Sequence, residues 1–430
     1  MNTSILENIR TMPRIPSEVA ALLSALQLDR PNIASLNKLS DPEWSSLLAF
    51  SDTAQLTLSI AQLPLEGFPD WVVERLKTNL ADNALRFERI KATYREASAA
   101  LERAGVEHVV IKGFTQAPDY VADPRLRSQS DIDIFCPPES IDDAQRALRA
   151  IGYEPSSVKI SYALADHNPT LVRLGDWKWR GNPFDPEMPP SIELHFCLWN
   201  EHVSRIGIPE TRLFWERRTM RMFGDFSYRC LSPVDQLGYF TLHILRNLFL
   251  REWIVLHVRE LAAFLHSRAD DDAFWRLWSD AHSPSLRSHE AIAFYYARAW
   301  FGCRLHPLAR HEIDSMSATR KSLLHCFCGS ALELMFHANK DSLWLHLSLL
   351  SSREEKWKVL RRNFIPASVG PIGVVPLQVR YKRLIQPRGT HRWQQYIHYM
   401  IARSLAFGRT NLATLRRGLR WRLSQHSFTR

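Results

Sequence analysis

Residues 109–135, VVIKGFTQAPDYVADPRLRSQSDIDIF, contain an apolar run, a loop with Pro and Asp, and a second apolar run. Strands disfavour aspartate, yet the second run carries Asp131 and Asp133. Because residues i and i+2 of a strand point to the same face, these carboxylates project side by side. Ile132 and Ile134 then face the opposite side, where a core would lie. The segment therefore predicts a buried strand with one acidic face.

A divalent cation is one solution for two neighbouring carboxylates, which repel each other and are costly to bury unpaired. Mg²⁺ takes oxygen ligands and commonly binds one or two carboxylates together with substrate phosphates. A third carboxylate, Glu193, lies in the strand-like segment SIELHFCLW. Acidic groups from neighbouring strands can hold two metal ions about 3.5–4 Å apart, as in phosphoryl transfer. The alternative is that Asp131 and Asp133 cap the helix after Pro137 or lie on an exposed strand edge.

Cationic residues flank the acidic strand. Gly113 follows Lys112 at the end of the first apolar run, and glycine there lets the backbone approach an anion closely. Lys112 would place a positive point charge beside the phosphates, while Arg125 and Arg127 would donate paired hydrogen bonds to phosphate oxygens. Of the two arginines, Arg127 is favoured. The alternatives are a simple turn glycine and solvated loop cations.

The order of predicted elements indicates an α+β fold, a small mixed β-sheet with N-terminal and C-terminal helical regions. We expect helices from 17 to 104 ending at Gly105, a helix opened by Ser140 and Asp143, and helices again from 233 to about 350. Strands are expected at 107–112, 131–136, 170–174 and 191–197. The expected parts are an N-terminal helical region, a sheet-containing core, a helical domain, and a basic extension with an amphipathic helix: 1–104, 105–230, 231–350 and 351–430.

Composition narrows the class of protein. The 430 residues include six cysteines without a CxxC pair, which argues against a disulfide framework or a structural zinc site. No segment reads as a secretory signal or as a membrane-spanning helix, so a cytoplasmic location is expected. Residues 356–430 hold 16 Lys and Arg and no Asp or Glu, so the net charge of +10 divides into +16 for this segment and −6 for the rest.

The basic segment includes NLATLRRGLRWRLS, in which leucines repeat at helical spacing and arginines lie largely off that stripe. We expect the leucines to pack against the main body and the arginines to form a solvated face. Alternatively, such a helix binds an anionic membrane surface, a partner helix or nucleic acid. The leucines are Leu412, Leu415, Leu419 and Leu423, and the arginines are Arg416, Arg417 and Arg420.

These motifs resemble the nucleotidyltransferase superfamily typified by DNA polymerase beta. More narrowly, the chain is similar to a bacterial family of uncharacterised nucleotidyltransferases that show a Lys-Gly turn, an Arg before an Asp-x-Asp strand, and a later Glu-Leu-His strand. Here these elements are Lys112-Gly113, RLRSQSDIDIF and IELHF. The resemblance extends to ADHNPTLVR and to REWIVLHVRELAAFL, a helix that carries an Arg and an acidic residue in relatives. It departs in Gly113-Phe114, where the superfamily usually has Gly-Ser.

The resemblance implies transfer of a nucleoside monophosphate from a nucleoside triphosphate such as ATP to an acceptor, with release of pyrophosphate. It implies two Mg²⁺ ions, with Mn²⁺ as the alternative metal. The acceptor class stays open among small molecules, sugars, peptides and proteins, and the oligomeric state stays open too. The implied catalytic and metal-binding residues are Asp131, Asp133 and Glu193, and the implied nucleotide-binding residues are Lys112, Gly113 and Arg127.

Two histidines are further candidates. His195 shares a strand face with Glu193, so it either orients a carboxylate, contacts the acceptor, or is a satisfied half-buried histidine. His167 either contacts the acceptor or makes a hydrogen bond within its loop, and the loop bond is favoured. Two alternative functions remain for the whole chain: a catalytically inactive nucleotide-binding or scaffold protein, and an RNA-directed nucleotidyltransferase.

Overall fold

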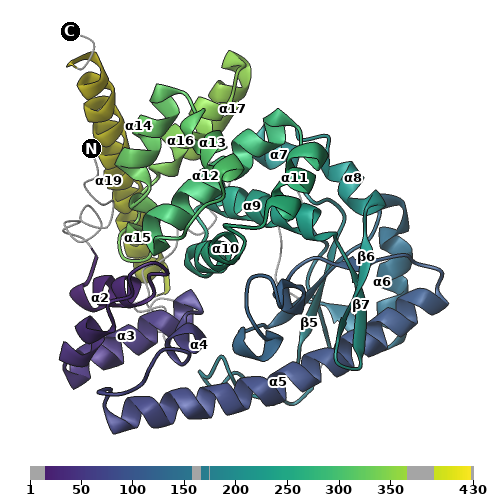
Figure 1. Ribbon diagram of the computed structural model, residues 1–430. Coiled ribbons are helices and arrows are strands. Elements are labelled where there is room, and N and C mark those ends of the chain that lie inside the picture. The colour runs from purple at the N-terminus through teal and green to yellow at the C-terminus, as the bar shows by residue number, and fades with distance from the viewer. Residues whose placement is uncertain (1–14, 157–165, 174, 366–391, 428–430) are drawn as a thin grey trace.

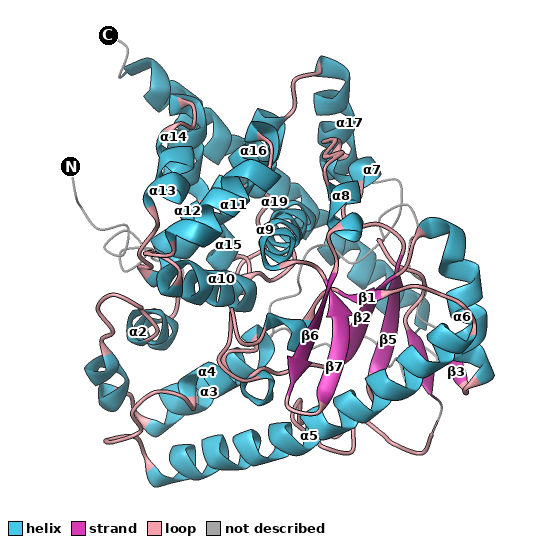
Figure 2. Cartoon of the chain, turned by 45° about the vertical axis from the view of Figure 1, so that its right-hand side comes forward, coloured by secondary structure: helices cyan, strands magenta, loops and turns pink. Residues whose placement is uncertain are grey.

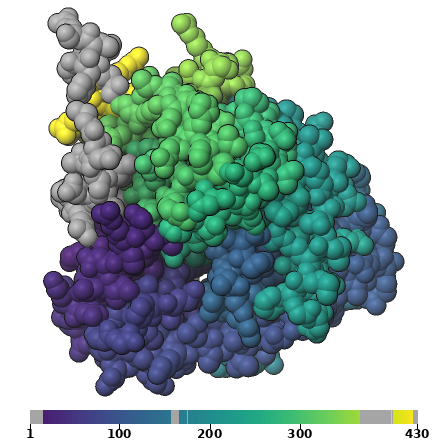
Figure 3. All heavy atoms as spheres, in the orientation of Figure 1, coloured from purple at the N-terminus to yellow at the C-terminus, as the bar shows by residue number. Residues whose placement is uncertain are grey.

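The computed structural model describes residues 15–156, 166–173, 175–365 and 392–427 (Figure 1). The described part of the chain begins with three short α-helices, and a long helix then spans the molecule from these helices to the β-sheet. Figure 3 shows the N-terminal helices in purple, the sheet region in blue to teal and the later helices in green meeting on one face. The helices are α2 (Ser17–Ala25), α3 (Asp41–Ala54), α4 (Thr57–Ile60) and α5 (Asp70–Arg103).

Helix α5 leads directly into the sheet, as its sequence predicts. Its buried residues include Phe87, Ile90, Tyr94 and Ala97, which recur at helical spacing and cover one face of the sheet. The helix ends where Gly105 adopts a φ of +72°, a left-handed conformation that glycine enters without steric cost. The predicted end of this helix is therefore confirmed.

Within the described residues, the strands form one mixed seven-stranded sheet in the order β3-β4-β5-β2-β1-β7-β6 (Figure 2). Strand β2 pairs antiparallel with β1 and parallel with β5, so it lies in the centre. The mixed sheet with helical flanks confirms the predicted α+β class. The strands are β1 (Val109–Val110), β2 (Asp131–Phe135), β3 (Tyr153–Pro155), β4 (Leu171–Arg173), β5 (Ser191–His195), β6 (Thr219–Phe223) and β7 (Phe226–Cys230).

The two faces of the sheet belong to two different cores. Ile132 and Ile134 of β2, with Ile192 and Leu194 of β5, are fully buried against α5 and α6 (Ile141–Ala150). The opposite face carries the polar side chains of β2 and β5 and turns toward the later helices. The alternation of strand side chains thus places the acidic residues between the sheet and the helical region.

Several boundaries and elements differ from the sequence predictions. Strand β1 is only two residues long, although Ile111 N still donates to Asp133 O at 3.1 Å. Ser140 precedes α6 without a side-chain capping bond, so the expectation that Ser140 and Asp143 form a capping box at the start of this helix is wrong. The hairpin of β6 and β7 was not predicted, because Met220 and Met222 of β6 are exposed and its pattern lacks an apolar face. Leu174, the end of one predicted strand, lies outside the described residues.

The helices after β7 pack with the N-terminal helices around one large core. Helix α9 begins at Ser232, whose hydroxyl accepts a hydrogen bond from Asp235 N, which confirms the predicted helix start. Gln27 Nε2 donates to Trp300 O at 2.6 Å and ties α2 to α12. Helices α7 (Glu201–Ser204) and α8 (Thr211–Glu216) precede β6. The helices after β7 are α9 (Pro233–Leu250), α10 (Val255–Ser267), α11 (Asp272–Ala281), α12 (Pro284–Phe301), α13 (Pro307–Asp314), α14 (Ala318–Phe327), α15 (Ser330–Glu333), α16 (Ser342–Leu349) and α17 (Arg353–Phe364).

The basic extension contains the predicted amphipathic helix, α19 (Arg392–Ser427), but the helix is turned the other way. Thr414 and Gly418 are buried against the body, and Trp421 Nε1 donates to Ser322 Oγ of α14 at 3.0 Å. Leu412, at 50% exposure, and Leu419, at 60%, lie on the solvent side. The expectation that the leucines pack against the body is therefore wrong. Small and aromatic side chains make the contact because the body presents Trp344 there.

All six cysteines are free thiols. Burial raises the pKa of Cys136 to about 12 and that of Cys303 to about 12, so these thiols stay protonated at neutral pH. Within the ranges that the structure describes, no helix has the length and apolar character needed to cross a membrane.

A buried histidine makes the stability of the helical region depend on pH. His282 Nδ1 lies 3.0 Å from Glu290 Oε1, and its Nε2 lies 3.6 Å from Asp235 Oδ1. Burial alone lowers the pKa of His282, but the two carboxylates outweigh burial and raise that pKa to about 9. An unfolded histidine titrates near about 6.5, so the stabilisation is complete below that pH and is lost as pH rises toward 9.

We predict that the free energy of unfolding falls by at most about 3 kcal/mol between pH 6.5 and pH 9 through this group. Urea unfolding of the wild type and of His282→Gln at several pH values measures it, because the difference between the two proteins isolates His282. The difference should shrink steadily as pH rises. A difference that stays constant across this range would contradict the assignment.

Candidate active site

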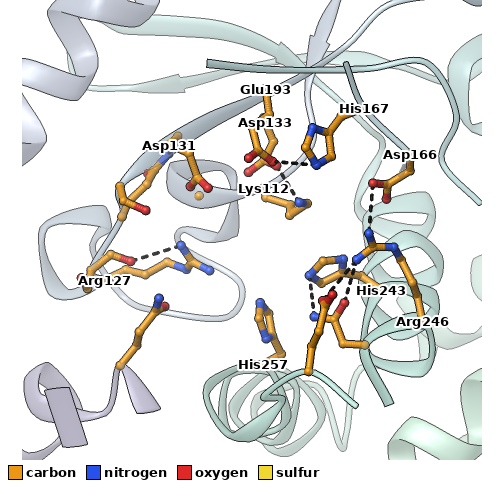
Figure 4. A pocket seen from close by; sticks show the side chains of 17 residues that line it. Lys112, Arg127, Asp131, Asp133, Asp166, His167, Glu193, His243, Arg246 and His257 are labelled. Atoms are coloured by element: carbon orange, nitrogen blue, oxygen red, sulfur yellow. Dashed lines mark hydrogen bonds and ion pairs between the residues drawn. The ribbon is translucent and has the colours of Figure 1, made fainter. Parts of the chain in front are cut away.

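A cavity of about 300 Å³ opens between the acidic face of the sheet and helices α9 and α10 (Figure 4). Its wall brings together residues that are distant in the sequence, from Gln55 after α3 to His257 of α10. Six of the residues predicted from the sequence line it: Lys112, Gly113, Arg127, Asp131, Asp133 and Glu193. His167 also lines it, and His195 lies behind Asp133.

Strand register places the acidic groups side by side. β2 and β5 are parallel, and Asp133 pairs with Glu193 while Asp131 pairs with Ser191. Among the described residues, Asp133, Glu193 and His195 offer ligand atoms that all lie within 4.8 Å of one another. Asp131 shares the strand face of Asp133, lines the same cavity and stands to one side of this group (Figure 4). The sequence prediction of one acidic face is confirmed.

Asp133 is the most enclosed carboxylate of the site, and two cationic or donor groups hold it. Lys112 Nζ lies 2.5 Å from Asp133 Oδ1, and His195 Nε2 donates to the same oxygen at 2.8 Å. Burial alone raises the pKa of Asp133, but Lys112 and His195 outweigh burial and hold it well below its usual range. Asp133 therefore stays ionised while fully enclosed.

Among the described residues, no cationic side chain forms an ion pair with Asp131. Burial, followed by the charges of Asp133 and Glu193, raises the pKa of Asp131 to about 7. Lys112 and Arg127 oppose this shift without cancelling it. The site thus carries more negative charge than its own cations neutralise, which is the condition that favours a bound cation.

Glu193 is positioned by residues of the segment before β4 and by His195 of β5. Thr170 Oγ1 donates to Glu193 Oε1 at 3.0 Å. The second oxygen, Oε2, lies 3.6 Å from His167 Nε2 and 3.8 Å from His195 Nε2. His167 also makes the expected local bond, with its Nδ1 2.6 Å from Asn168 O. Of the alternatives for His195, orientation of a carboxylate agrees with these contacts, and the side chain is 1% exposed rather than half-buried.

Sequence reasoning missed a second ion-pair network on the far side of the cavity. Arg246 Nη2 lies 3.3 Å from Asp166 Oδ1, and Arg246 Nη1 lies 3.4 Å from Glu252 Oε2. Asp166 Oδ1 is also 3.9 Å from Nδ1 of His195, which links this network to Asp133. Arg246 and Glu252 interrupt an otherwise apolar helical pattern, and that interruption was the available signal.

The side chains of Arg127 and Arg125 lie in different places, and only Arg127 lines the cavity. Arg127 Nε lies 2.7 Å from Glu260 Oε1 of α10, and both side chains are less than a tenth exposed. Arg125 pairs with Asp123 beside it and does not line the cavity. The preference for Arg127 over Arg125 agrees with this placement. Glu260 is one of the two acidic residues, with Glu252, in the helix segment that the resemblance singled out.

Helix α5 holds the segment that carries Arg127. The side chain of Arg86 is fully buried and donates to Gln129 O at 2.8 Å and to Met188 O at 3.0 Å. Asn83 Nδ2 donates to Arg125 O at 2.6 Å and to Arg127 O at 3.1 Å. An arginine buried in a helix was not recognised from the sequence, because its partners are backbone carbonyls far along the chain.

Two further histidines, His243 of α9 and His257 of α10, face the acidic residues from the helical side (Figure 4). Their rings lie 4.9 Å apart between centroids. Burial, together with nearby cations including Lys112, lowers the pKa of His243 well below its usual value and that of His257 to about 3. Both are therefore neutral at physiological pH and can donate or accept a hydrogen bond. Neither was predicted, because single histidines carry no spacing signal.

A mixed sheet with paired acidic strands, a Lys-Gly turn and buried arginines defines a nucleotidyltransferase-like α+β protein. The chain belongs to the family described as "Uncharacterised nucleotidyltransferase", whose model matches residues 40–302. This match contains every residue of the cavity and confirms the resemblance drawn from the motifs. No curated protein and no solved structure is significantly similar to the chain.

Gly113 offers a test of the turn beside the acidic strand. Its φ is +71°, and a Cβ there would lie 2.1 Å from Gln129 Nε2. Gln129 is 7% exposed and donates to Asp131 O at 2.6 Å, so it cannot move without losing a hydrogen bond. Gly105 has nearly the same φ, +72°, but nothing lies within 4 Å of its Cβ position.

We predict that Gly105→Ala lowers the free energy of unfolding by about 1–2 kcal/mol through the left-handed conformation alone. Gly113→Ala should cost about 1–3 kcal/mol more, through displacement of buried Gln129. In a Gln129→Ala background this excess should vanish. Urea unfolding of the four variants measures it, and equal costs at Gly105 and Gly113 would show that the close contact with Gln129 is unimportant.

Proposed function

We propose that the protein is a Mg²⁺-dependent nucleotidyltransferase that moves a nucleoside monophosphate from a nucleoside triphosphate to an acceptor hydroxyl. In this reaction the acceptor oxygen forms a bond to the α-phosphorus, the bond from that phosphorus to the bridging oxygen breaks, and pyrophosphate leaves. The observation that carries the proposal is the pairing of Asp133 with Glu193 on parallel strands, in a chain that belongs to a nucleotidyltransferase family.

The donor set fits a hard divalent cation. Asp131, Asp133 and Glu193 supply carboxylate oxygens on one face, and burial together with the charges of Asp133 and Glu193 raises the pKa of Asp131. We propose these three residues as the ligands of one or two Mg²⁺ ions, with Mn²⁺ as a substitute. The bound metal would polarise the phosphate oxygens and stabilise charge on the attacking and leaving oxygens.

Lys112, Gly113 and Arg127 are proposed to bind the triphosphate. Lys112 stands beside Asp133, so its charge is available at the edge where phosphates would meet the carboxylates. Arg127 is held rigidly by Glu260, which leaves the rest of the guanidinium to face the cavity it lines. The Gly113 turn keeps side-chain atoms away from this edge. Positioning and charge neutralisation are the contributions that phosphoryl transfer requires of a protein.

The acceptor is proposed to enter between Glu193 and the helices. Glu193 would take the proton from the acceptor hydroxyl, with His167 and His195 close to one of its oxygens. Neutral His243 and His257 would hydrogen-bond the acceptor from the opposite wall. This wall supports a polar, uncharged acceptor group such as the hydroxyl of a small molecule, sugar or peptide.

We further propose that the chain works as four parts in a reducing cytoplasm, which the free cysteines support. Residues 105–230 would form the catalytic core, and 231–350 would supply the opposite wall of the site. Residues 1–104 would brace the core through α5, and 351–430 would form the basic extension. Asn83 and Arg86 of α5 support the bracing role, since they bond the segment before β2.

We predict that Asp133→Asn lowers Mg²⁺-dependent nucleotidyl transfer by at least about 1,000-fold, because the ionised ligand beside Lys112 is lost. Glu193→Gln should have a similar effect. Asp123→Asn is the matched control, since Asp123 precedes the same strand but pairs with Arg125 outside the cavity. The measurement is pyrophosphate release from each of the four labelled triphosphates with Mg²⁺ and a cellular small-molecule extract as the source of acceptors.

Transfer that survives in Asp131→Asn/Asp133→Asn would refute the proposal. The second candidate function is a nucleotide-binding protein without catalysis, which the family description leaves possible because it assigns no substrate. Titration of ATP with and without Mg²⁺ separates the two. Tight metal-dependent binding without pyrophosphate release in any extract would favour the second candidate.

A further inference from the structure

Helix α19 is anchored to the body along one side only. Thr414 is fully buried, and a Cβ at Gly418 would lie 2.3 Å from Trp344, so the helix backbone lies against that ring. Arg417 adds ion pairs at 3.3 Å to Glu333 and at 3.1 Å to Asp341. Figure 1 shows the C-terminal part of α19 beside α14 at the edge of the molecule. These contacts fix which face of the helix points outward.

The outward face carries a stripe of large apolar side chains. At about 100° per residue, its members fall within an arc of roughly 80°, on the side of the helix away from Thr414 and Arg417. Exposed apolar residues spaced singly are ordinary, but a continuous stripe along one helix is not. The stripe consists of Ile401, Leu405, Leu412, Leu415 and Leu419, at 55%, 55%, 50%, 40% and 60% exposure.

Exposed arginines flank this stripe. Arg409, Arg416 and Arg420 follow one edge at helical spacing, and Arg422 lies at the other. Residues 356–430 contain no Asp or Glu, so the chain places no acidic residue in this helix to balance them. An apolar stripe with arginines and no acidic residue along its edges is the pattern of a helix that lies in the plane of an anionic lipid interface.

We propose that the outward face of α19 binds the surface of an anionic phospholipid bilayer. The leucine stripe enters the boundary between headgroups and acyl chains, and the arginines bind lipid phosphates and carboxylates at its edges. The docked face keeps α19 attached to the body, so the whole protein is held at the surface. The residues that line the cavity are not part of this face.

The charge of α19 favours an anionic lipid surface over two other binding partners, a second copy of the chain and nucleic acid. A second copy would bring another acid-free arginine row against the first, and like charges at a helix interface oppose pairing. Nucleic acid would attract the arginines, but its phosphate backbone gives a row of exposed leucines nothing apolar to contact. An anionic lipid surface offers acyl chains to the leucine stripe and negatively charged headgroups to the arginines.

The test is co-sedimentation of the full-length protein with vesicles of phosphatidylcholine alone or mixed with phosphatidylglycerol. We expect binding only to the anionic vesicles, and weaker binding as NaCl rises from about 0.05 to about 0.5 M. Each arginine near an anionic surface contributes roughly 5-fold, so Arg409→Gln/Arg416→Gln/Arg420→Gln should reduce partitioning by about 100-fold. Leu412→Ser/Leu415→Ser/Leu419→Ser should reduce it by at least about 10-fold.

Matched controls change the same residue types at similar exposure elsewhere. Arg30→Gln/Arg146→Gln/Arg276→Gln removes the same charge, from side chains that are 94%, 71% and 76% exposed. Leu85→Ser/Leu213→Ser/Leu277→Ser removes leucines that are 62%, 48% and 62% exposed. Both controls should bind vesicles like the wild type. Circular dichroism confirms that every variant keeps its helices.

Four results would overturn the proposal. Absence of binding to anionic vesicles, or unchanged binding in the leucine variant, would show that the apolar stripe does not contact lipid. A dimer in sedimentation equilibrium that the leucine variant converts to monomer would make a second copy the occupant. Salt-sensitive binding of single-stranded RNA that the arginine variant loses and the leucine variant keeps, without lipid binding, would assign the face to nucleic acid.

Discussion

The parallel pairing of β2 with β5 is the constraint on which the site depends. It sets Asp133 directly beside Glu193, in register, on the face of the sheet turned toward the helices. Two carboxylates this close are unfavourable unless positive charge is brought to them. Lys112, from the end of β1 on the other side of β2, supplies part of that charge at 2.5 Å. Burial and the neighbouring carboxylates raise the pKa of Asp131 to about 7, which agrees with the proposal that a bound cation supplies the rest.

The surrounding helices give this acidic face a fixed shape. Helix α5 uses buried Arg86 to hold the segment before β2 through its carbonyls, and α10 uses Glu260 to hold Arg127. Helix α9 contributes Arg246, which pairs with Asp166 near His195. Arg127 and Arg246 of the cavity thus each pair with an acidic residue from another element. Such partners restrict side-chain freedom before any substrate arrives.

The strand motifs could be predicted because they depend on local alternation. The two-residue period alone placed Asp131 and Asp133 on one face, and the spacing of Glu193 and His195 did the same on β5. The far wall could not be predicted, because Arg246, His243 and His257 reach the cavity only through the packing of α9 and α10. The orientation of α19 was wrong for a related reason: the leucines looked like core, while the contact is made by Gly418 and Thr414 against Trp344. Periodicity gives two faces of a helix, but only the partner surface decides which one is buried.

The most direct measurement of the central claim is anomalous diffraction from Mn²⁺ in crystals grown with a non-hydrolysable nucleoside triphosphate. The account predicts a Mn²⁺ peak at about 2.0–2.2 Å from carboxylate oxygens of Asp133 and Glu193. The triphosphate should lie between that peak and the side chains of Lys112 and Arg127. A peak elsewhere on the protein, or bound nucleotide with no metal at these two carboxylates, would contradict it.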